Sequence, residues 1–359
     1  MSCPFLPPEL LDLIVDHLHD QPISLKSCCL VSKSWIPRAR RNLFARIEFN
    51  SYSSSIESWR NAFPDPSLSP THYTRVLEII GLPTVGAAGA REFPWIHSFR
   101  RIVTLFVGTI GWSDDRLSLV HFRGLSPTLR SLSLYCASAP LPEIFGLICS
   151  FPLLEDLALH HEDPKCDLVG WTIPSTSPKL TGSLKLGGQN LSIIRGLLCL
   201  PGGLHFSKIL VSRPVGDVES IMDLASRCRN TLESLRVKLF LHTVNSKMPS
   251  PLDLSRAPKL RDVGFEVGPL DIQWVVVTLK ATKPKLLRQI TIHSNGVSPE
   301  PTPEAVRGWR DLDHLLAGLW TSHSILPKIS RRDCLQALAP SLLPELTSKG
   351  FKPEFGYEW

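Results

Sequence analysis

The sequence lacks the short motifs that accompany several common kinds of catalysis. It contains no G-x-S-x-G nucleophile elbow, no phosphate-binding P-loop, no G-x-G-x-x-G after a strand-like segment and no H-E-x-x-H zinc motif. Two glycine pairs, Gly187-Gly188 and Gly202-Gly203, have the composition of turns between strands and helices rather than of phosphate cradles. We therefore expect a non-catalytic protein that needs no cofactor.

Paired cysteines and metal-ligand clusters are also missing. The nine cysteines include no C-x-x-C pair, which predicts reduced thiols rather than a disulfide framework. The one group of potential metal ligands is His160-His161 with Asp163 and Cys166. Because adjacent residues of a strand point to opposite faces, and no second ligand pair has suitable spacing, no metal site is predicted.

Long apolar runs are absent as well. The longest, such as residues 274–279, are far shorter than the ~20 residues that a membrane span needs. Positions 1–30 carry four acidic side chains and one lysine, which is the wrong charge order for a secretory or mitochondrial signal. We expect a soluble protein of the cytoplasm or nucleus, without a membrane partner.

Charge gives little indication of nucleic-acid binding. The 39 basic and 33 acidic residues leave a net charge of +6, and no polybasic tail is present. We therefore expect no nucleic-acid partner.

Leucine and proline are the residues in excess. The 359 residues include 56 leucines and 31 prolines, with 43% hydrophobic and 20% charged residues. This composition provides enough apolar material for a large core and too little charge for a disordered chain. At roughly 150 residues per domain the length suggests two or three domains, but the leucines instead follow a short N-terminal module and a long repetitive region.

The N-terminal module has the apolar spacing of three short helices. The first begins at a proline pair followed by an acidic residue, and its apolar side chains recur at every fourth position, at Leu10, Ile14 and Leu18. Serines are expected to cap the second and third helices, namely Ser24, and Ser32 or Ser34. Such a unit is too small to be stable alone, so its apolar faces need a partner or the rest of the chain.

The same segment resembles the F-box motif. The resemblance is carried by L-P-x-E-L at residues 6–10, with Ile14 and Leu18, by L-V-S-K-x-W at 30–35 and by A-R-x-x-L-F at 39–44. It covers about residues 4–50 and implies a three-helix module that inserts into the Skp-type adaptor of a cullin–RING ubiquitin ligase. The adaptor contacts that it implies are Leu6, Pro7, Leu10, Ile14, Leu18, Leu25, Cys28, Val31 and Trp35.

An internal role for this module is the alternative, because apolar stripes usually form cores. The basic cluster of Arg38, Arg40, Arg41 and Arg46 has the composition of a phosphate-binding surface. On a helix that also carries Trp35, such a cluster is more often a solvated face, so no role in chemistry is predicted for it.

The leucine excess follows a repeat of about 26 residues, within the range of known solenoid periods. An L-x-x-L-x-L pattern, with other aliphatic residues or Phe accepted, occurs in eight registers whose first positions recur at a nearly constant interval. These first positions are Ile102, Leu129, Leu154, Thr181, Phe206, Leu232, Leu260 and Leu287, of which the Thr181 register lacks the first aliphatic residue. Proline precedes several of them and extends the chain before a strand. Helices are predicted between strands, at 141–150, 191–200, 218–228 and 272–281.

A strand plus a helix in about 20–29 residues is the rule of leucine-rich repeats, in which each unit buries its apolar edge by stacking on the next. Residues 70–295 resemble a leucine-rich-repeat solenoid with helices on its convex side, although the Asn or Cys expected after each strand is mostly missing. A TIM barrel also alternates strand and helix, but eight short units without a phosphate-type glycine loop make it the weaker alternative.

The predicted fold class is therefore α/β, a three-helix module followed by a solenoid and a helical cap. The expected domains are an F-box-like helical module at 1–50, a leucine-rich-repeat-like solenoid at 51–295 and a C-terminal cap and tail at 296–359. Early strands are predicted at 46–49 and 75–80. In the cap we expect two helices, at 305–320 and 331–349, because a solenoid needs its end covered.

The repeat also predicts which side chains face away from the core. Strand side chains alternate, so the polar positions of each pattern form an exposed concave face. A basic stripe from three successive strands is expected there, with aromatic and aliphatic contacts at one end. An acidic or phosphorylated ligand suits it, although exposed lysines also serve solubility alone. The candidate substrate-binding residues are Tyr135, His160, Lys185, Lys208, Arg236 and Lys238.

Together these features predict a substrate-recognition subunit of an SCF-type ubiquitin ligase. The F-box would bind the Skp-type adaptor on the cullin scaffold, and the repeats would bind a protein substrate. The alternative is a leucine-rich-repeat binding or scaffold protein that acts outside ubiquitination and uses the helical module only as an N-terminal cap.

Overall fold

The chain forms two compact units. Its computed structural model describes residues 7–50, 55–81, 94–108, 119–135, 139–162, 172, 175–188, 191–212, 218–238, 250–268, 271–281, 286–294, 302–323, 325–331 and 343–350. Unit 1 is Met1–Leu154 and unit 2 is Glu155–Trp359.

Unit 1 begins with the three short helices that the sequence predicts, α1 (Pro8–His17), α2 (Pro22–Val31) and α3 (Ile36–Leu43). The capping serines were predicted wrongly. Gln21 precedes α2, and the Ser24 hydroxyl donates to its side chain (3.0 Å) instead of capping the helix, while Trp35 precedes α3. A proline in the first turn of each helix replaces the cap, because it removes one of the amides that a cap would satisfy.

The three helices share a small core of their own. Val15, Leu25, Cys28 and Ala39 are buried at its centre. Further apolar side chains pack around this centre, namely Leu18, Cys29, Trp35 and Leu43. The module is therefore a packed unit rather than three loose helices.

Four parallel strands follow in unit 1, each hydrogen-bonded to the next in chain order. They are β1 (Arg46–Asn50), β2 (Val76–Ile80), β3 (Thr104–Gly108) and β4 (Ser131–Tyr135). The connecting and flanking helices are α4 (Ser55–Ala62), η2 (Pro66–Leu68), η3 (Pro70–Tyr73), η5 (Pro94–Ser98), η6 (Leu119–Phe122) and α5 (Leu141–Cys149). Both early strands predicted from the sequence are confirmed.

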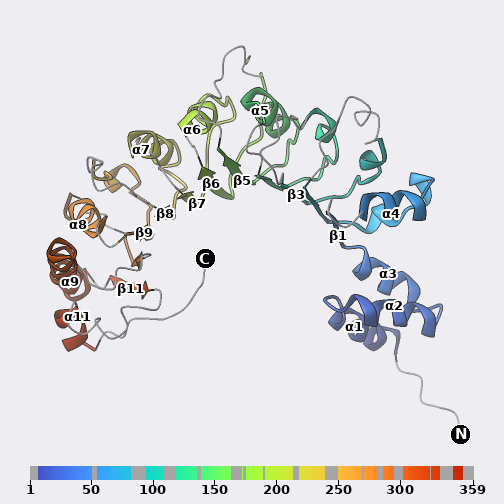
Figure 1. Ribbon diagram of the computed structural model, residues 1–359, viewed down its shortest axis with the longest axis horizontal. Helices are drawn as coiled ribbons and strands as arrows, with labels where there is room; N and C mark the ends of the chain where they lie inside the picture. Colours follow the sequence, from blue (N-terminus) through green and yellow to red (C-terminus); the bar gives the residue numbers. More distant parts are fainter. Residues whose placement is uncertain are drawn as a thin grey trace, which may run out of the picture. The chain divides into compact units, whose positions relative to one another are not determined.

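Unit 2 repeats the same arrangement over seven parallel strands, again paired in chain order. These are β5 (Asp156–His161), β6 (Ser183–Gly188), β7 (Lys208–Ser212), β8 (Ser234–Lys238), β9 (Asp262–Val267), β10 (Gln289–Ser294) and β11 (Leu326–Arg331). The helices are α6 (Leu191–Leu198), α7 (Val218–Arg227), η7 (Leu254–Arg256), α8 (Ile272–Ala281), α9 (Pro303–His323) and α11 (Pro344–Ser348). Helices α6, α7 and α8 lie on the same side of the strands (Figure 1).

The sequence repeat has a direct structural counterpart. All eight predicted registers fall on strands, β3 to β10, and all four predicted inter-strand helices are present. The apolar positions of successive strands are paired and buried, as for Leu157, Leu184 and Ile209. Stacking each apolar row on the next builds the core. Parallel strands that alternate with helices confirm the α/β class and a solenoid-like arrangement within each unit; the leucine-rich-repeat assignment stays a prediction.

The C-terminal cap differs from the expectation. The helix predicted at 331–349 was wrong at its start, because residues 326–331 form strand β11, which pairs with β10. Pro327 hides this strand in the sequence, since proline is tolerated in a strand only at a sheet edge or bulge. Beyond β11 the described part of the chain has one helix, the short α11; residues 332–342 lie outside the described residues.

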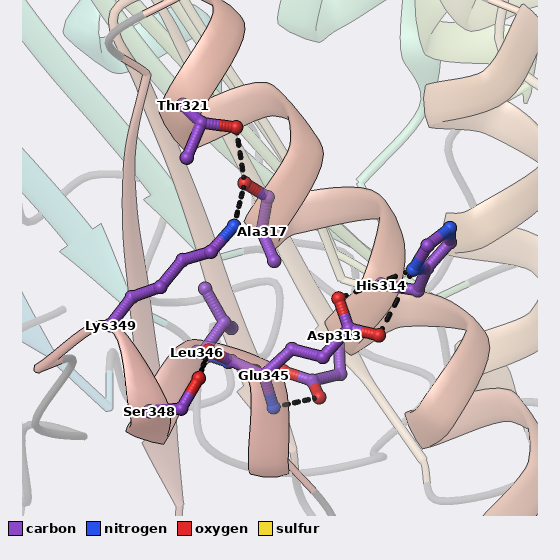
Figure 2. Close-up of polar contacts among 8 residues, drawn as sticks. All are labelled: Asp313, His314, Ala317, Thr321, Glu345, Leu346, Ser348 and Lys349. Atoms are coloured by element: carbon purple, nitrogen blue, oxygen red, sulfur yellow. Dashed lines mark hydrogen bonds and ion pairs between the residues drawn. The ribbon is translucent and has the colours of Figure 1, made fainter.

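A buried carboxylate joins α11 to α9. The Asp313 side chain accepts hydrogen bonds from the backbone N–H groups of Glu345 (2.7 Å) and Leu346 (2.9 Å), and Lys349 Nζ donates to the Ala317 carbonyl (3.0 Å) (Figure 2). Burial raises the pKa of Asp313 in spite of the two backbone donors. These bonds hold α11 against α9.

Candidate functional site

The outer surface of the helical module is unusually apolar. Six of the twelve exposed large hydrophobic side chains among the described residues lie between residues 10 and 31. They are Leu10, Leu13 and Ile14 on α1, and Ile23, Leu30 and Val31 on α2. Leu30 and Val31 are 88% and 68% exposed. We call these six side chains the outer apolar face; exposed apolar side chains concentrated on two neighbouring elements of the chain are typical of interaction sites.

Both helices therefore carry apolar side chains in two directions. Val15 on α1 and Leu25 on α2 face the core of the module, whereas Ile14 and Leu30 face solvent. A helix that only covers a core needs one apolar stripe. The second stripe remains available for another molecule.

The adaptor contacts that the F-box resemblance implies differ in their exposure in the structure. Pro7, Leu10, Ile14 and Val31 are exposed, and Leu18 and Trp35 are half-buried against the module core. Leu25 and Cys28 have to be corrected, because they are buried inside the module and offer no surface to a partner. Leu6 lies outside the described residues. The sequence reasoning missed Leu13, Ile23 and Leu30, although Leu13 stands one helical turn from Leu10.

An ion pair fixes α1 against α3 within the module. Arg38 Nε donates to Asp16 Oδ1 (2.7 Å), Arg38 Nη2 contacts the other carboxylate oxygen, and Asn42 Nδ2 donates to Oδ1 (2.9 Å). Hydrogen bonds from Arg38 and then Asn42 hold the pKa of Asp16 well below its usual range. Arg38 thus orders the module, while Arg40 and Arg41 are exposed and Arg46 pairs with Glu78 (2.9 Å).

The predicted basic stripe lies on one face of the unit 2 sheet, but not in one line. Lys185 and Arg236 share a row on either side of Leu210. Lys208 is paired with Ser183 and Ser234, one row earlier, and Lys238 is paired with Ser212, one row later. The four cations are therefore spread over three rows.

Acidic side chains interrupt this stripe. Lys238 forms an ion pair with the buried carboxylate of Glu266, and Asp262 stands in the row of Lys208, two strands away. Lys185 and Lys208 are exposed, whereas Arg236 and Lys238 are half-buried. The stripe is a mixed surface rather than a continuous positive one.

The other two predicted contacts have partners of their own. His160 Nε2 lies 3.0 Å from Glu162 Oε1, and the exposed Tyr135 ring, which belongs to unit 1, lies 5.3 Å from the Phe106 ring between centroids. His161 is buried on the opposite face from His160, as strand alternation predicts. Asp163 and Cys166 lie outside the described residues, within which no group of three potential metal ligands occurs.

Two of the cysteines have thiols of low reactivity. Burial raises the pKa of the Cys149 and Cys228 thiols to about 11, so both stay protonated near neutral pH and are poor nucleophiles. The five cysteines in the described part of the chain are free thiols.

His293 makes the stability of unit 2 depend on pH. Burial, and then the positive charges of Arg236 and Lys238, lower its pKa from 6.5 to about 4. Because the folded state disfavours the protonated ring, the free energy of unfolding should fall as pH is lowered from about 6.5 to about 4. Allowing for partial exposure, we expect this residue to account for about 1–3 kcal/mol of that fall. Urea unfolding of wild type and His293→Gln across this range measures it, and equal pH slopes in the two proteins would contradict the prediction.

No protein-family model and no curated protein matches this chain. In the part of the chain that the structure describes, no helix is both long and apolar enough to cross a membrane. The surfaces described above are thus the basis for inferring a function.

Proposed function

We propose that the chain is the substrate-recognition subunit of an SCF-type cullin–RING ubiquitin ligase. In this proposal the outer apolar face of α1 and α2 binds a Skp-type adaptor, and the repeats bind a protein substrate. The chain contributes no catalytic group, because ubiquitin transfer takes place on other subunits. The observation that carries the proposal is the second apolar stripe on α1 and α2.

The energy available from this stripe suits a stable complex. Burying one exposed Leu, Ile or Val side chain contributes about 1.5–3 kcal/mol, and six such side chains lie on these two short helices. Short amphipathic helices commonly dock by placing apolar side chains at helical spacing into a groove of the partner. The internal core and the Asp16–Arg38 pair keep α1, α2 and α3 in a fixed arrangement for such docking.

A scaffold protein outside ubiquitination is the second candidate. It is favoured by the contacts of the module with the rest of unit 1, where the Phe44 ring meets the Trp59 ring edge-on (6.3 Å) and α3 lies against η3. In that case the module would only cap the sheet. A cap buries one side of its helices and gives no reason for the exposure of Leu30 and Val31.

Adaptor capture tests the proposal. The wild-type chain should co-purify with a Skp-type adaptor, and replacing Leu30 and Val31 by Asp should weaken capture by about a hundredfold, because two carboxylates would have to be buried in an apolar interface. Both residues are exposed, so the thermal unfolding temperature should stay the same. Pro7→Ala with Leu10→Ala should also weaken capture.

A matched control is available in unit 1. Leu68 is 78% exposed and lies on η2, away from the helical module in sequence. Leu68→Asp should leave adaptor capture unchanged. If the wild type does not bind the adaptor, or if the Leu30/Val31 and Leu68 variants bind equally well, the scaffold function is correct instead.

A further inference from the structure

One long segment of the chain carries arginine but no lysine. Residues 34–164 contain twelve arginines and no lysine, whereas the rest of the chain contains twelve arginines and fifteen lysines. Either residue type serves solubility. Only the planar guanidinium of arginine binds a carboxylate through two parallel hydrogen bonds, so an arginine-only region points to recognition of oxyanions.

Four of these arginines lie where the strands of unit 1 begin. Arg75 and Arg130 directly precede β2 and β4, and Arg100 and Arg101 lie in the turn before β3. We call these four exposed residues the arginine edge. The Val103 N–H donates to the Arg75 carbonyl (2.8 Å), and the Arg130 N–H donates to the Val103 carbonyl (2.9 Å). These bonds place Arg75 and Arg130 in one row, two strands apart.

The arginine edge extends into the turn between these two residues. Arg75 Nη1 donates to the Arg101 carbonyl (3.3 Å), so its guanidinium reaches the segment that carries Arg100 and Arg101. Neighbouring strands are about 4.8 Å apart, which separates the Arg75 and Arg130 backbones by about 9.6 Å. The cations thus form a row rather than a single convergent cluster.

Arginine outnumbers acidic residues in the described segment that carries this row. From residue 75 to residue 130 the described part of unit 1 has five arginines and one acid, Glu78, which is paired with Arg46. The fifth arginine, Arg123, lies elsewhere, over Gly146 of α5. In unit 2 the corresponding positions before the strands are mixed in charge: Glu155, Gly182, Ser207, Glu233, Arg261 and Arg288. The concentration of positive charge is therefore specific to the edge in unit 1.

We propose that the arginine edge binds a carboxylate-rich, extended segment of a partner protein. Every second side chain of an extended peptide points the same way, at intervals of about 6.6–6.8 Å. The cations lie in a row over three strands, so several Asp or Glu side chains along such a segment can each meet a guanidinium group, whereas one phosphate group needs guanidinium groups that converge on a point. The inference rests on the proposed function only in identifying this partner as a substrate.

Binding of a defined peptide tests the site in the full chain. The probe is a short fluorescent peptide of alternating Glu and Ser, measured by fluorescence anisotropy. Arg75→Glu with Arg130→Glu should weaken binding at least about tenfold, and the charge-preserving Arg75→Lys with Arg130→Lys should still weaken it, by about threefold, because bidentate contacts are lost. Affinity should fall with added salt.

The matched control reverses the charge of two arginines at the equivalent positions in unit 2. Arg261 and Arg288 hold the equivalent positions before β9 and β10 and are exposed. Arg261→Glu with Arg288→Glu should leave peptide affinity within about twofold. Thermal unfolding verifies that each variant is folded. If the Arg75/Arg130 variant does not fold, Arg101→Glu alone replaces it and should weaken binding about threefold.

Three results would overturn the inference. The first is equal affinity of wild type and the arginine-edge variant, and the second is loss of binding in the Arg261/Arg288 variant instead. The third is binding of a single-phosphoserine peptide, or of a single-stranded RNA of equal length, about tenfold more tightly than the Glu peptide. Adaptor capture depends on α1 and α2, so failure of the peptide test is distinct from failure of the proposed function.

Discussion

Replacing Gly188 with alanine is expected to destabilise unit 2 by about 3 kcal/mol or more. Gly188 ends β6 with a φ of +78°, in the left-handed region that favours glycine. It is paired with His161 of β5, and a Cβ atom would overlap the His161 carbonyl group, with its carbon only 2.8 Å away. The carbonyl oxygen and carbon of His161 are backbone atoms, so rotation of a side chain cannot relieve the overlap. Chemical unfolding followed by circular dichroism measures the loss.

Gly350, in the same unit, distinguishes the effect of the positive φ from the effect of the overlap with a neighbouring strand. Its φ is +84°, but no atom lies within 4 Å of the position that a Cβ would occupy. Gly350→Ala should therefore cost only the backbone strain, about 1 kcal/mol. If both variants lose the same stability, the close approach of β5 and β6 has no energetic importance.

Truncating Trp274 is expected to cost about 3–5 kcal/mol. This side chain on α8 is 1% exposed and packs edge-on against Phe265 of β9, with 5.8 Å between ring centroids. Its Nε1 also donates to the Ser250 carbonyl (3.0 Å). Trp274→Ala would leave a cavity between helix and strand and remove the hydrogen bond to Ser250, and each destabilises the fold. The midpoint of urea unfolding of unit 2 reports the change.

Val277 provides the comparison on the same helix. It is 39% exposed, one turn from Trp274. Val277→Ala should cost less than about 1 kcal/mol, because it removes few buried contacts. Comparable losses from the two substitutions would show that α8 is not held by its inner face.

The interval at which the apolar pattern repeats was the most reliable information in the sequence. Two buried apolar positions per strand, recurring at a nearly constant interval, located β3 to β10 because a stacked core requires the same spacing in every repeat. Strand β11 was missed because Pro327 interrupts its alternation, and its pairing with β10 depends on contacts that local propensity does not contain. Proline located the start of the first helix, but the serine caps predicted for the second and third helices were wrong, because a proline in the first turn of each removes the need for a cap.

The candidate site shows a second limit of prediction from sequence. Periodicity identifies an apolar face on α2, but Leu25 and Leu30 are both apolar, and only the packed structure shows that the first is buried and the second exposed. Similarly, the sequence found the basic side chains of unit 2, but not their rows or the pairing of Lys238 with Glu266. Strand register and partner choice are tertiary properties, so residue type alone cannot supply them.

The chain-order pairing of the strands also bears on how the protein is made. In each unit every strand after the first pairs with the strand that directly precedes it in the sequence. A chain leaving the ribosome can therefore add one strand at a time to a sheet that already exists, without waiting for distant segments. The three-helix module, which comes first, can acquire its core before the unit 2 strands have been synthesised.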